Sequence, residues 1–424
     1  MTTAPAAAPL VSRTVPLPDP GPLLDLLPRR GGMAWVRRGE GMVGWGETLR
    51  LPTGGPGDGR FAQAEASWRE MCRRAVVRDE VGLPGTGPVA FGSFAFSPSS
   101  PAGGVLVVPR VVVGRRGDRW WLTTTGTGSL PPGLAAAGVA PSRRPEPASP
   151  GTVTFADGAL SAVGWQAAVA DAVRRITAGA LDKVVLARDL QARTEHPVDP
   201  RRLLGRLAER YPGCWTFSVD GLVGATPEML VRREKGLVTS RVLAGTIRRS
   251  GNDAHDLELA ARLARSSKDL EEHEYAVRSV AEALAPHCTS TNVPEAPFVL
   301  HLANVMHLAT DVTAVLADDT SSLGLAAALH PSAAVCGTPT SAAAALIEQI
   351  EGMDRDRYAG PVGWMDAEGD GEWGIALRCA RLDPEDDHRL RLFAGCGIVA
   401  GSDPQDELAE SVAKLVPMRE ALSG

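Results

Sequence analysis

The chain has 424 residues, of which 44% are hydrophobic and 22% are charged, as is usual for a folded globular protein. Its net charge of -6 comes from 44 basic and 50 acidic residues without a dominant basic stretch, which argues against a nucleic-acid partner. No run of about 18 or more apolar residues is present to span a membrane, and the six cysteines form no CxxC pair, which argues against a zinc site or a disulfide framework. We therefore expect a cytoplasmic protein with reduced, mostly structural thiols.

The N-terminal third of the chain is expected to be a short tail followed by strands. Residues 1–22 are assigned to a flexible tail because they are rich in Ala, Thr and Pro and lack the features of a secretory signal peptide. Strands are predicted at 33–50 (two strands around a turn), 104–114 and 118–125. Residues 129–151 are rich in Pro, Ala and Gly and are typical of a linker or a surface loop. Residues 23–150 are therefore taken as the strand-rich N-terminal part of the fold.

The remaining region, residues 151–424, alternates helices with strands. Helices are predicted from their apolar spacing at 165–178, 202–211, 253–285 and 404–422. Strands are predicted at 183–190, 214–219, 222–224, 229–232, 237–242, 361–365, 373–380 and 390–394. Antiparallel strands with several long helices indicate an α+β fold, in a single large domain, rather than a parallel dinucleotide-binding sheet.

The last predicted helix carries carboxylates at helical spacing. Asp403 suits the N-cap and Pro404 the first helical position, so that Glu407, Glu410 and Lys414 fall on one face. Such a face is usually a solvated surface with an ion pair. The alternative is a carboxylate cluster directed inward at a divalent cation.

A second acidic cluster lies in the long helix predicted at 253–285. The sequence KDLEEH at 268–273 has the same two interpretations, and a solvated surface is again the more common one. Mg²⁺ usually takes one or two carboxylates from a protein and completes its coordination with water and substrate. One glutamate from each helix would meet that need.

Four further segments combine polar residues with strands or turns. The loop GCGIVAG at 395–401 is a weak dinucleotide motif because Ala400 replaces the third glycine, but closely spaced glycines can present N–H groups to a carboxylate. KVVLAR at 183–188 starts a strand with a lysine, and GATPEML at 224–230 places a glutamate in a turn. VLAGT at 242–246 ends a strand in small residues. In isolation each of the four is more often structural than functional.

Taken together, these segments resemble the chorismate-utilising enzyme family over roughly residues 155–422. The matching segments, in order, are KVVLAR (183–188), GATPEML (224–230), LAGT (243–246), KDLEEH (268–273), HLATDV (307–312), LHPSAAVCGTP (329–339), YAGPVGW (358–364), ALRCA (376–380), GCGIVAGSDP (395–404) and ELAESVAKL (407–415). Each segment is weak alone, but ten in the order and spacing of the family are a strong signal.

The resemblance implies β-sheets packed between helices and a cleft, formed by residues 151–424, that binds chorismate above Mg²⁺. It implies Glu272 and Glu410 as magnesium ligands, with Glu407 nearby and acting through water. The residues that it implies for substrate binding are Gly245, Thr246, His307, Ala334, Tyr358, Arg378, Gly395 and Gly397. Arg378 and Tyr358 would bind a substrate carboxylate, a contact for which a guanidinium fork is well suited.

Within the family, the residues favour the isochorismate synthases. The branch that adds water has a lysine as general base where this chain has Lys183, whereas the aminodeoxychorismate branch often has a lysine where this chain has Ala244. Salicylate synthases tend to have threonine at the position of Ala334. A salicylate synthase is the main alternative. An ammonia-using synthase subunit with a glutaminase partner and a non-catalytic chorismate-binding protein are more distant ones.

The resemblance also implies a mechanism. Uncharged Lys183 removes a proton from the water that attacks C2 of chorismate, and protonated Glu228 donates to the departing C4 hydroxyl. Burial favours the uncharged form of each group. Mg²⁺ binds the ring carboxylate and stabilises charge that develops there. We expect a monomer without a glutaminase partner, and the sequence leaves open whether the product serves menaquinone or siderophore synthesis.

Overall fold

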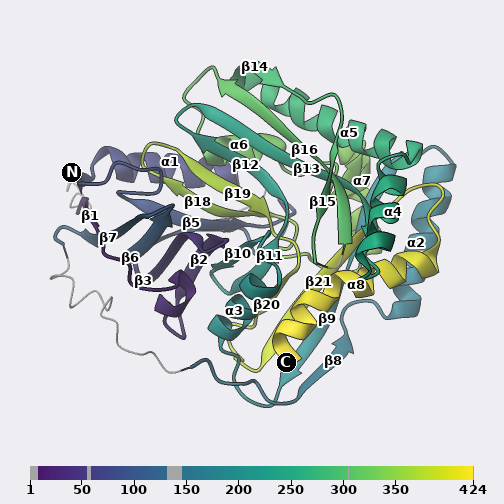
Figure 1. Ribbon diagram of the computed structural model, residues 1–424, viewed down its shortest axis with the longest axis horizontal. Coiled ribbons are helices and arrows are strands. Elements are labelled where there is room, and N and C mark those ends of the chain that lie inside the picture. Colours follow the sequence, from purple (N-terminus) through teal and green to yellow (C-terminus); the bar gives the residue numbers. More distant parts are fainter. Residues whose placement is uncertain (1–7, 55–58, 131–145, 304, 424) are drawn as a thin grey trace, which may run out of the picture.

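The computed structural model of the chain describes residues 8–54, 59–130, 146–303 and 305–423, except for the side chains of Lys268 and Glu272. The described strands belong to one hydrogen-bonded network, with eight α-helices in the described residues packed around it (Figure 1). This arrangement confirms the expected α+β class. No helix among the described residues has the length and apolarity needed to cross a membrane.

The strand network divides at β6. One edge of β6 (Gly104–Arg116) pairs with β3 (Glu40–Thr53), and the other edge pairs first with β5 (Val89–Phe94) and then with β7 (Arg119–Thr127). Because β6 has three neighbours, three sets of strands extend from it. The set through β7 is short and contains only β1 (Leu10–Pro16) and β4 (Val76–Asp79) in addition. The other two sets begin with β3 and with β5 and contain the remaining strands. We call these sets the first and the second arm.

The first arm continues from β3 through β2, β10, β11, β20 and β21 to β9, which is flanked by β8 and β17. These strands are β2 (Gly32–Arg37), β10 (Trp215–Val219), β11 (Leu222–Thr226), β20 (Cys379–Leu382), β21 (Arg389–Ile398), β9 (Lys183–Thr194), β8 (Val153–Asp157) and β17 (Gly337–Thr338). The second arm continues from β5 through β18, β19, β12 and β13 to β16, which also pairs with β14 and β15. These strands are β18 (Pro361–Asp366), β19 (Gly371–Ile375), β12 (Met229–Glu234), β13 (Leu237–Arg248), β16 (Val305–Leu316), β14 (Cys288–Asn292) and β15 (Phe298–His301).

At two neighbouring points a short segment leads the chain directly from a strand of one arm to a strand of the other. Pro227 and Glu228 connect β11 to β12, and residues 376–378 connect β19 to β20. The crossings are joined by backbone hydrogen bonds, from Ala225 to the carbonyl of Arg378 (3.2 Å) and from Ile375 to the carbonyl of Glu228 (3.1 Å). Two site residues predicted from the sequence, Glu228 and Arg378, therefore lie at these crossings between the arms.

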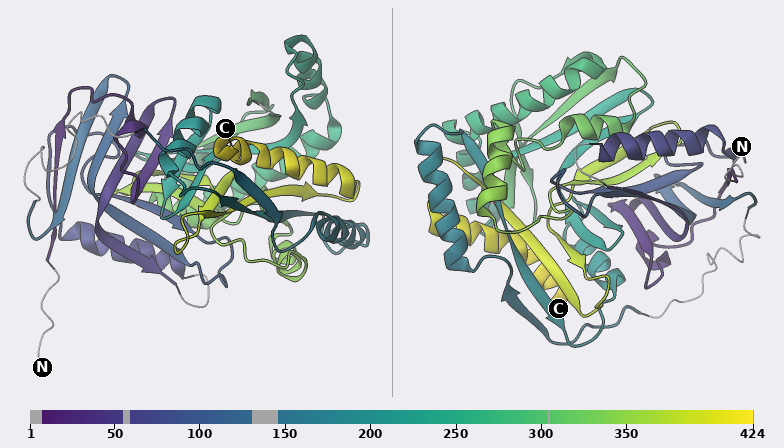
Figure 2. Two further views of the ribbon diagram at one scale, coloured as in Figure 1. Left: turned by 90° about the horizontal axis from the view of Figure 1, so that it is seen from below. Right: turned by 180° about the vertical axis from the view of Figure 1, so that it is seen from behind.

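Helices cover the arms on their outer sides. The helices are α1 (Arg60–Arg73), α2 (Ala162–Thr177), α3 (Pro200–Arg210), α4 (Asp253–Leu263), α5 (Ser267–Leu284), α6 (Ser322–Leu329), α7 (Thr340–Ile350) and α8 (Pro404–Ser423). Helix α5 packs on β13 and β16, α6 on β12 and β19, α7 on β9, and α8 on β21. Large side chains fill the interior, among them the fully buried Trp35, Phe217 and Trp373. Figure 2 shows the N-terminal strands and α2 at opposite ends of the molecule.

The predicted tail is wrong for residues 10–16, which form strand β1 (Leu10–Pro16). Leu10, Ser12 and Thr14 alternate with more exposed residues, and their side chains are buried where β1 pairs with β7 and with β4 (Val76–Asp79). The polar members of this alternation concealed the strand in the sequence. Residues 1–7 and most of the predicted linker, 131–145, lie outside the described residues.

The single helix predicted at 253–285 is also wrong, because the chain forms two helices there, α4 and α5. The side chain of Ser266 accepts a hydrogen bond from the backbone of Asp269 and caps α5. Leu263 is buried before the break, and Leu270 packs against the same apolar cluster after it. The apolar period therefore continues across the break and gives no sign of it.

The strand predicted at 373–380 is interrupted in the structure, where β19 ends at Ile375 and β20 begins at Cys379. Arg378 has a φ of 48°, in the left-handed region that non-glycine residues rarely adopt. This conformation turns the chain from the second arm to the first. Strain of this kind persists only where the surrounding structure enforces it, commonly at a functional site.

Candidate active site

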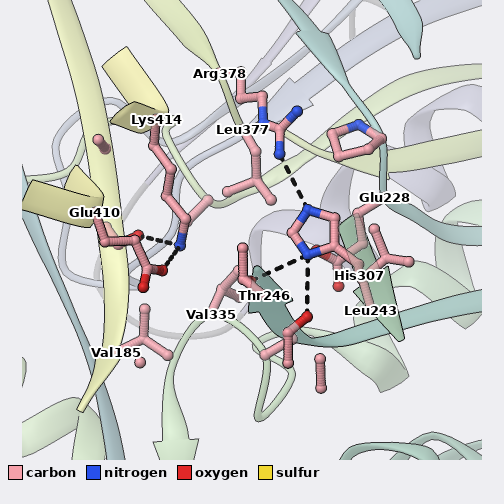
Figure 3. A pocket seen from close by; sticks show the side chains of 18 of the residues that line it. Val185, Glu228, Leu243, Thr246, His307, Val335, Leu377, Arg378, Glu410 and Lys414 are labelled. Atoms are coloured by element: carbon pink, nitrogen blue, oxygen red, sulfur yellow. Dashed lines mark hydrogen bonds and ion pairs between the residues drawn. The ribbon is translucent and has the colours of Figure 1, made fainter. Parts of the chain in front are cut away.

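A cavity of about 260 Å³ lies beside the two crossings, and residues of both arms line it. The site residues inferred from the sequence that line it are Lys183, Glu228, Gly245, Thr246, His307, Ala334, Tyr358, Arg378, Gly395, Gly397, Glu407 and Glu410. They come from both arms, from the two crossing segments and from α8 (Figure 3). Glu272 belongs to α5, but its side chain lies outside the described residues, so its role stays a prediction.

Glu228 is a buried acid on the wall of this cavity. Its residue is 7% exposed, and burial raises the pKa of its carboxyl to about 8, although Lys183, Lys414 and Arg378 act in the opposite direction. Its backbone N–H donates to Thr226 Oγ1 over 3.2 Å, which fixes the turn after β11. Glu228 therefore holds its proton at neutral pH, as a proton donor must.

Lys183 begins β9 at the edge of the cavity. Its Cα pairs with that of Thr338 in β17, and its side chain is half-buried. Lys183 also lines a second hollow, of about 460 Å³, whose other lining residues include Tyr275 of α5 and Thr338 of β17. A base at this position would have water within reach from that hollow and bound substrate in the cavity.

Arg378, His307 and Thr246 form a hydrogen-bonded chain (Figure 3). Arg378 Nη2 lies 3.2 Å from His307 Nε2, and His307 Nδ1 lies 3.1 Å from Thr246 Oγ1 and 3.3 Å from the carbonyl oxygen of Gly245. Burial, with Arg378 and Lys414 nearby, lowers the pKa of His307 to about 3, so the imidazole is neutral. The tautomer that fits has its proton on Nδ1 and accepts from Arg378 at Nε2.

One nitrogen of the same guanidinium is left for a ligand. Arg378 Nη1 is buried and has no hydrogen-bond partner among the described residues. A buried unpaired donor is costly, and an anion in the cavity would satisfy it. The unpaired Nη1 is compatible with the carboxylate-binding role that the resemblance implies for Arg378, and that role stays a prediction.

Tyr358 and Gly395 lie together on another wall. The Tyr358 ring stacks on Phe393 with centroids 5.0 Å apart. A Cβ at Gly395 would lie 3.0 Å from the Tyr358 hydroxyl and 2.9 Å from the carbonyl oxygen of Leu186. Glycine is therefore needed at 395 because the tyrosine and the neighbouring strand approach its backbone closely.

The carboxylates of α8 face the cavity beside a lysine. Lys414 Nζ lies 2.7 Å from Glu410 Oε1 and donates to the carbonyl oxygen of Gly395 over 2.9 Å. Glu407 Oε1 accepts from Ser402 Oγ over 2.7 Å. The sequence alone places Lys414 on a charged helix face and gives it no role in the site. Its spacing from Glu410 was the available signal, but the approach to Gly395 depends on how α8 packs.

The donor set on α8 suits a hard cation. Ligand atoms of Glu407, Glu410 and Cys396 lie within 4.8 Å of one another. Burial raises the pKa of the Cys396 thiol and keeps it neutral, so the two carboxylates are the donors available. Carboxylate oxygens are the ligands that Mg²⁺ prefers.

Comparison with known proteins assigns the family. Residues 33–423 match the family described as chorismate binding enzyme. The chain belongs to this family. The matched region includes helices α1 to α8 and almost all of both arms. Every residue that lines the cavity of this chorismate-binding enzyme lies within it.

The chorismate-binding enzyme has relatives that are named isochorismate synthases. It is 38% identical over 413 residues to the salicylate biosynthesis isochorismate synthase of Pseudomonas aeruginosa, an alignment that covers 92% of this chain and 84% of the relative. It is 41% identical over 266 residues to an isochorismate synthase of Bacillus subtilis, covering 60% of this chain and 66% of the relative. The solved structure of the menaquinone-specific isochorismate synthase of Escherichia coli is 26% identical, with a TM-score of 0.81, and the match covers 98% of this chain and 96% of that structure.

The cavity of this chorismate-binding enzyme combines cations with one protonated acid. Arg378 and Lys414 supply positive groups, Lys183 supplies an amine, and Glu228 supplies a proton. Two carboxylate groups of a small substrate would find cationic partners there. A proton acceptor and a proton donor in one enclosed site suit acid–base chemistry.

Proposed function

We propose that this enzyme is an isochorismate synthase, which adds water at C2 of chorismate and releases the C4 hydroxyl. The observation that carries the proposal is that Lys183 and the buried Glu228, whose pKa is raised to about 8, line the same cavity. The names of the relatives support the same reaction.

In the proposed reaction Lys183 accepts a proton from the attacking water, and Glu228 gives its proton to the departing hydroxyl. Both conjugated ring double bonds shift by one position, from C1–C2 and C5–C6 to C6–C1 and C4–C5. Water therefore enters at C2, water leaves from C4, and the product is an isomer of the substrate. Arg378 Nη1 and the Tyr358 hydroxyl hold a substrate carboxylate, while neutral His307 keeps the guanidinium of Arg378 in place. Because these donors are fixed before substrate arrives, little reorganisation is needed during the reaction.

We propose Mg²⁺ as the cofactor, held by Glu410 and Glu272, with Glu407 acting through water. When bound, Mg²⁺ would supply positive charge to the ring carboxylate of the substrate. The cluster of Glu407 and Glu410 oxygens supports this assignment for the part of the chain that the structure describes. The ion pair between Glu410 and Lys414 would be exchanged, at least in part, for contacts with the cation.

A salicylate synthase, which also eliminates pyruvate, is the second candidate. Ala334 lines the cavity at the position where the sequence analysis expects threonine in that branch. Ala244, which also lines it, occupies the position of the lysine of the aminodeoxychorismate branch.

We therefore propose an enzyme that stops at isochorismate and acts as a monomer without a glutaminase partner. Six free cysteines support a reducing, cytoplasmic setting.

Purified enzyme incubated with chorismate and Mg²⁺, without ammonia, tests the proposal when products are identified by chromatography and mass spectrometry. Isochorismate alone, lost on chelation, is the expected result. Salicylate together with pyruvate would transfer the assignment to the second candidate. No conversion of chorismate would refute the proposal.

A further inference from the structure

A buried ion pair lies immediately after α7 at the wall of the cavity, which its arginine, Arg355, helps to line. Glu351 and Arg355 are four residues apart in the sequence, and their side chains are 1% and 2% exposed. Arg355 Nε donates to Glu351 Oε2 over 2.9 Å, and Arg355 Nη2 contacts Glu351 Oε1. The guanidinium also lies over the ring of Phe96, 4.2 Å from its centroid. The functions proposed above use neither residue.

The pair is bonded to two segments that carry site residues. Arg355 Nη2 donates to the carbonyl oxygen of Val185 over 2.6 Å, and Arg355 Nη1 donates to that of Val335 over 2.9 Å. Glu351 Oε1 accepts from the backbone N–H of Ala187 over 2.7 Å. Val185 and Ala187 follow Lys183 along β9, and Val335 follows the pocket residue Ala334.

These bonds complete a junction between β9 and residues 332–338. The N–H of Val185 already donates to the carbonyl of Cys336 over 2.8 Å, and Gly337 pairs with Val184. The guanidinium of Arg355 adds a second connection between the two segments, because it donates to a carbonyl oxygen of each. Glu351 in turn holds the guanidinium. Strand β9 therefore enters the cavity with its backbone bonded both to the 332–338 segment and to the ion pair.

Stability alone is a weak reason for such a pair. The free energy needed to remove two charges from water offsets much of their mutual attraction. Proteins in which apolar residues replace a buried ion pair are often as stable as the original protein. A guanidinium differs from an apolar group in presenting several donors in a fixed plane, so one side chain can hold a carboxylate and two carbonyl groups together. What the pair adds is a fixed relation between those backbone segments.

We propose that Glu351 and Arg355 are positioning residues, which set the place of Lys183 relative to the substrate. The inference rests on the proposed function in taking Lys183 as the base. Displacement of a reacting group by about 1 Å can cost about 10²-fold in rate. Loss of the junction should therefore slow turnover, whereas Arg378 and the α8 carboxylates, which lie on other elements, should still bind the substrate.

The test uses two variants that keep the buried charges, Arg355→Lys and Glu351→Asp. Lysine cannot bond to Val185, Val335 and Glu351 in one plane, and aspartate is too short to hold both Ala187 and the guanidinium. Arg233→Lys is the matched control. Arg233 is also poorly exposed (13%) and bonds to a carboxylate, Asp370, and a carbonyl, that of Glu368, but it lies away from the cavity.

Rates of chorismate consumption are normalised to the folded fraction, measured by circular dichroism at the assay temperature. We expect kcat of both variants to fall about tenfold or more with KM within about threefold of wild type, and the control to keep both constants. Variants with kcat within about twofold of wild type, a loss confined to KM, or an equal loss in the control would overturn the positioning role. Wild-type enzyme that consumes no chorismate would instead refute the proposed function.

Discussion

Arg378 donates a hydrogen bond from Nη2 to Nε2 of the neutral imidazole of His307, 3.2 Å away. This bond holds one side of the guanidinium, while Nη1 has no hydrogen-bond partner among the described residues and is the group that we propose binds a substrate carboxylate. It also explains why a buried histidine lies beside a buried arginine, since only an uncharged imidazole can accept from it.

The substitution Arg378→Lys should weaken substrate binding. Lysine keeps the positive charge but cannot bond to His307 and to a carboxylate as a fixed fork, so we expect KM for chorismate to rise about tenfold or more. Steady-state kinetics measure the change. Arg381→Lys, in which the arginine three residues further on bonds instead to the carbonyl of Asp220, serves as the control and should leave KM unchanged. An unchanged KM in Arg378→Lys would contradict the carboxylate role.

Removal of either proposed proton-transfer group should abolish measurable turnover. We expect Lys183→Ala and Glu228→Gln each to lower kcat by about 10²-fold or more while the circular dichroism spectrum stays that of the wild type. Asp182→Asn changes the exposed residue before Lys183 and should keep full activity. Near-wild-type rates in Lys183→Ala or Glu228→Gln would mean that the acid and base roles are assigned wrongly.

The raised pKa of Glu228 predicts how activity depends on pH. Since the carboxyl must be protonated to act as an acid, kcat/KM should fall as pH rises above about 8, the value to which burial raises its pKa. A pH–rate profile measures this limb. Constant kcat/KM from pH 7 to pH 10 would show that protonated Glu228 is not required.

The same pKa has a consequence for stability. Between the ordinary value of 4.5 and about 8, folded Glu228 holds a proton that the unfolded chain releases, so its contribution to the free energy of unfolding declines as pH rises through this window. Denaturant unfolding at pH 5 and pH 9 should show a larger decline for wild type than for Glu228→Gln. Asp366, whose pKa burial also raises to about 8, contributes equally to both proteins and cancels in the comparison.

Replacement of a carboxylate on α8 should weaken the cation site. Glu410→Gln removes one charged donor, and we expect the Mg²⁺ concentration for half-maximal activity to rise about tenfold or more. Calorimetric titration with Mg²⁺ alone gives a second measurement that does not depend on turnover. Glu420→Gln changes a more exposed glutamate on the same helix, which pairs with Arg210, and should leave Mg²⁺ affinity unchanged. Equal affinities in wild type and Glu410→Gln would exclude Glu410 as a ligand.

Gly395 gives a steric prediction. A methyl group there would press on the Tyr358 hydroxyl and the Leu186 carbonyl, so Gly395→Ala should destabilise the protein by about 1–3 kcal/mol and lower its activity. Nothing lies within 4 Å of a Cβ placed at Gly401, so Gly401→Ala is the control. Thermal unfolding and steady-state rates of the two variants make the comparison. Similar behaviour of both would show that the close approach at 395 is not needed.

Sequence patterns are sufficient to predict a helix or a strand where its residues follow a short-range periodicity. The carboxylates of α8 follow from helical spacing alone, and β2, β3, β6 and β7 follow from β-rich runs around turns. The residues inferred to line the site were recognised as segments in a characteristic order, and all whose side chains are described line one cavity. Elements without such a pattern, including α1, α6 and α7, were not predicted.

By itself, the sequence determined the α+β class, many of the strands and helices, and which side chains belong to the site, because short-range periodicity and residue type are written along the chain. Only the tertiary structure decided that the strand network divides at β6 and that Glu228 and Arg378 lie at the crossings between its arms. It also decided the raised pKa of Glu228 and the junction made by Arg355, which joins residues 20 and 170 positions away in the sequence. Burial and contacts between distant segments arise only when the chain is packed, so no local pattern encodes them.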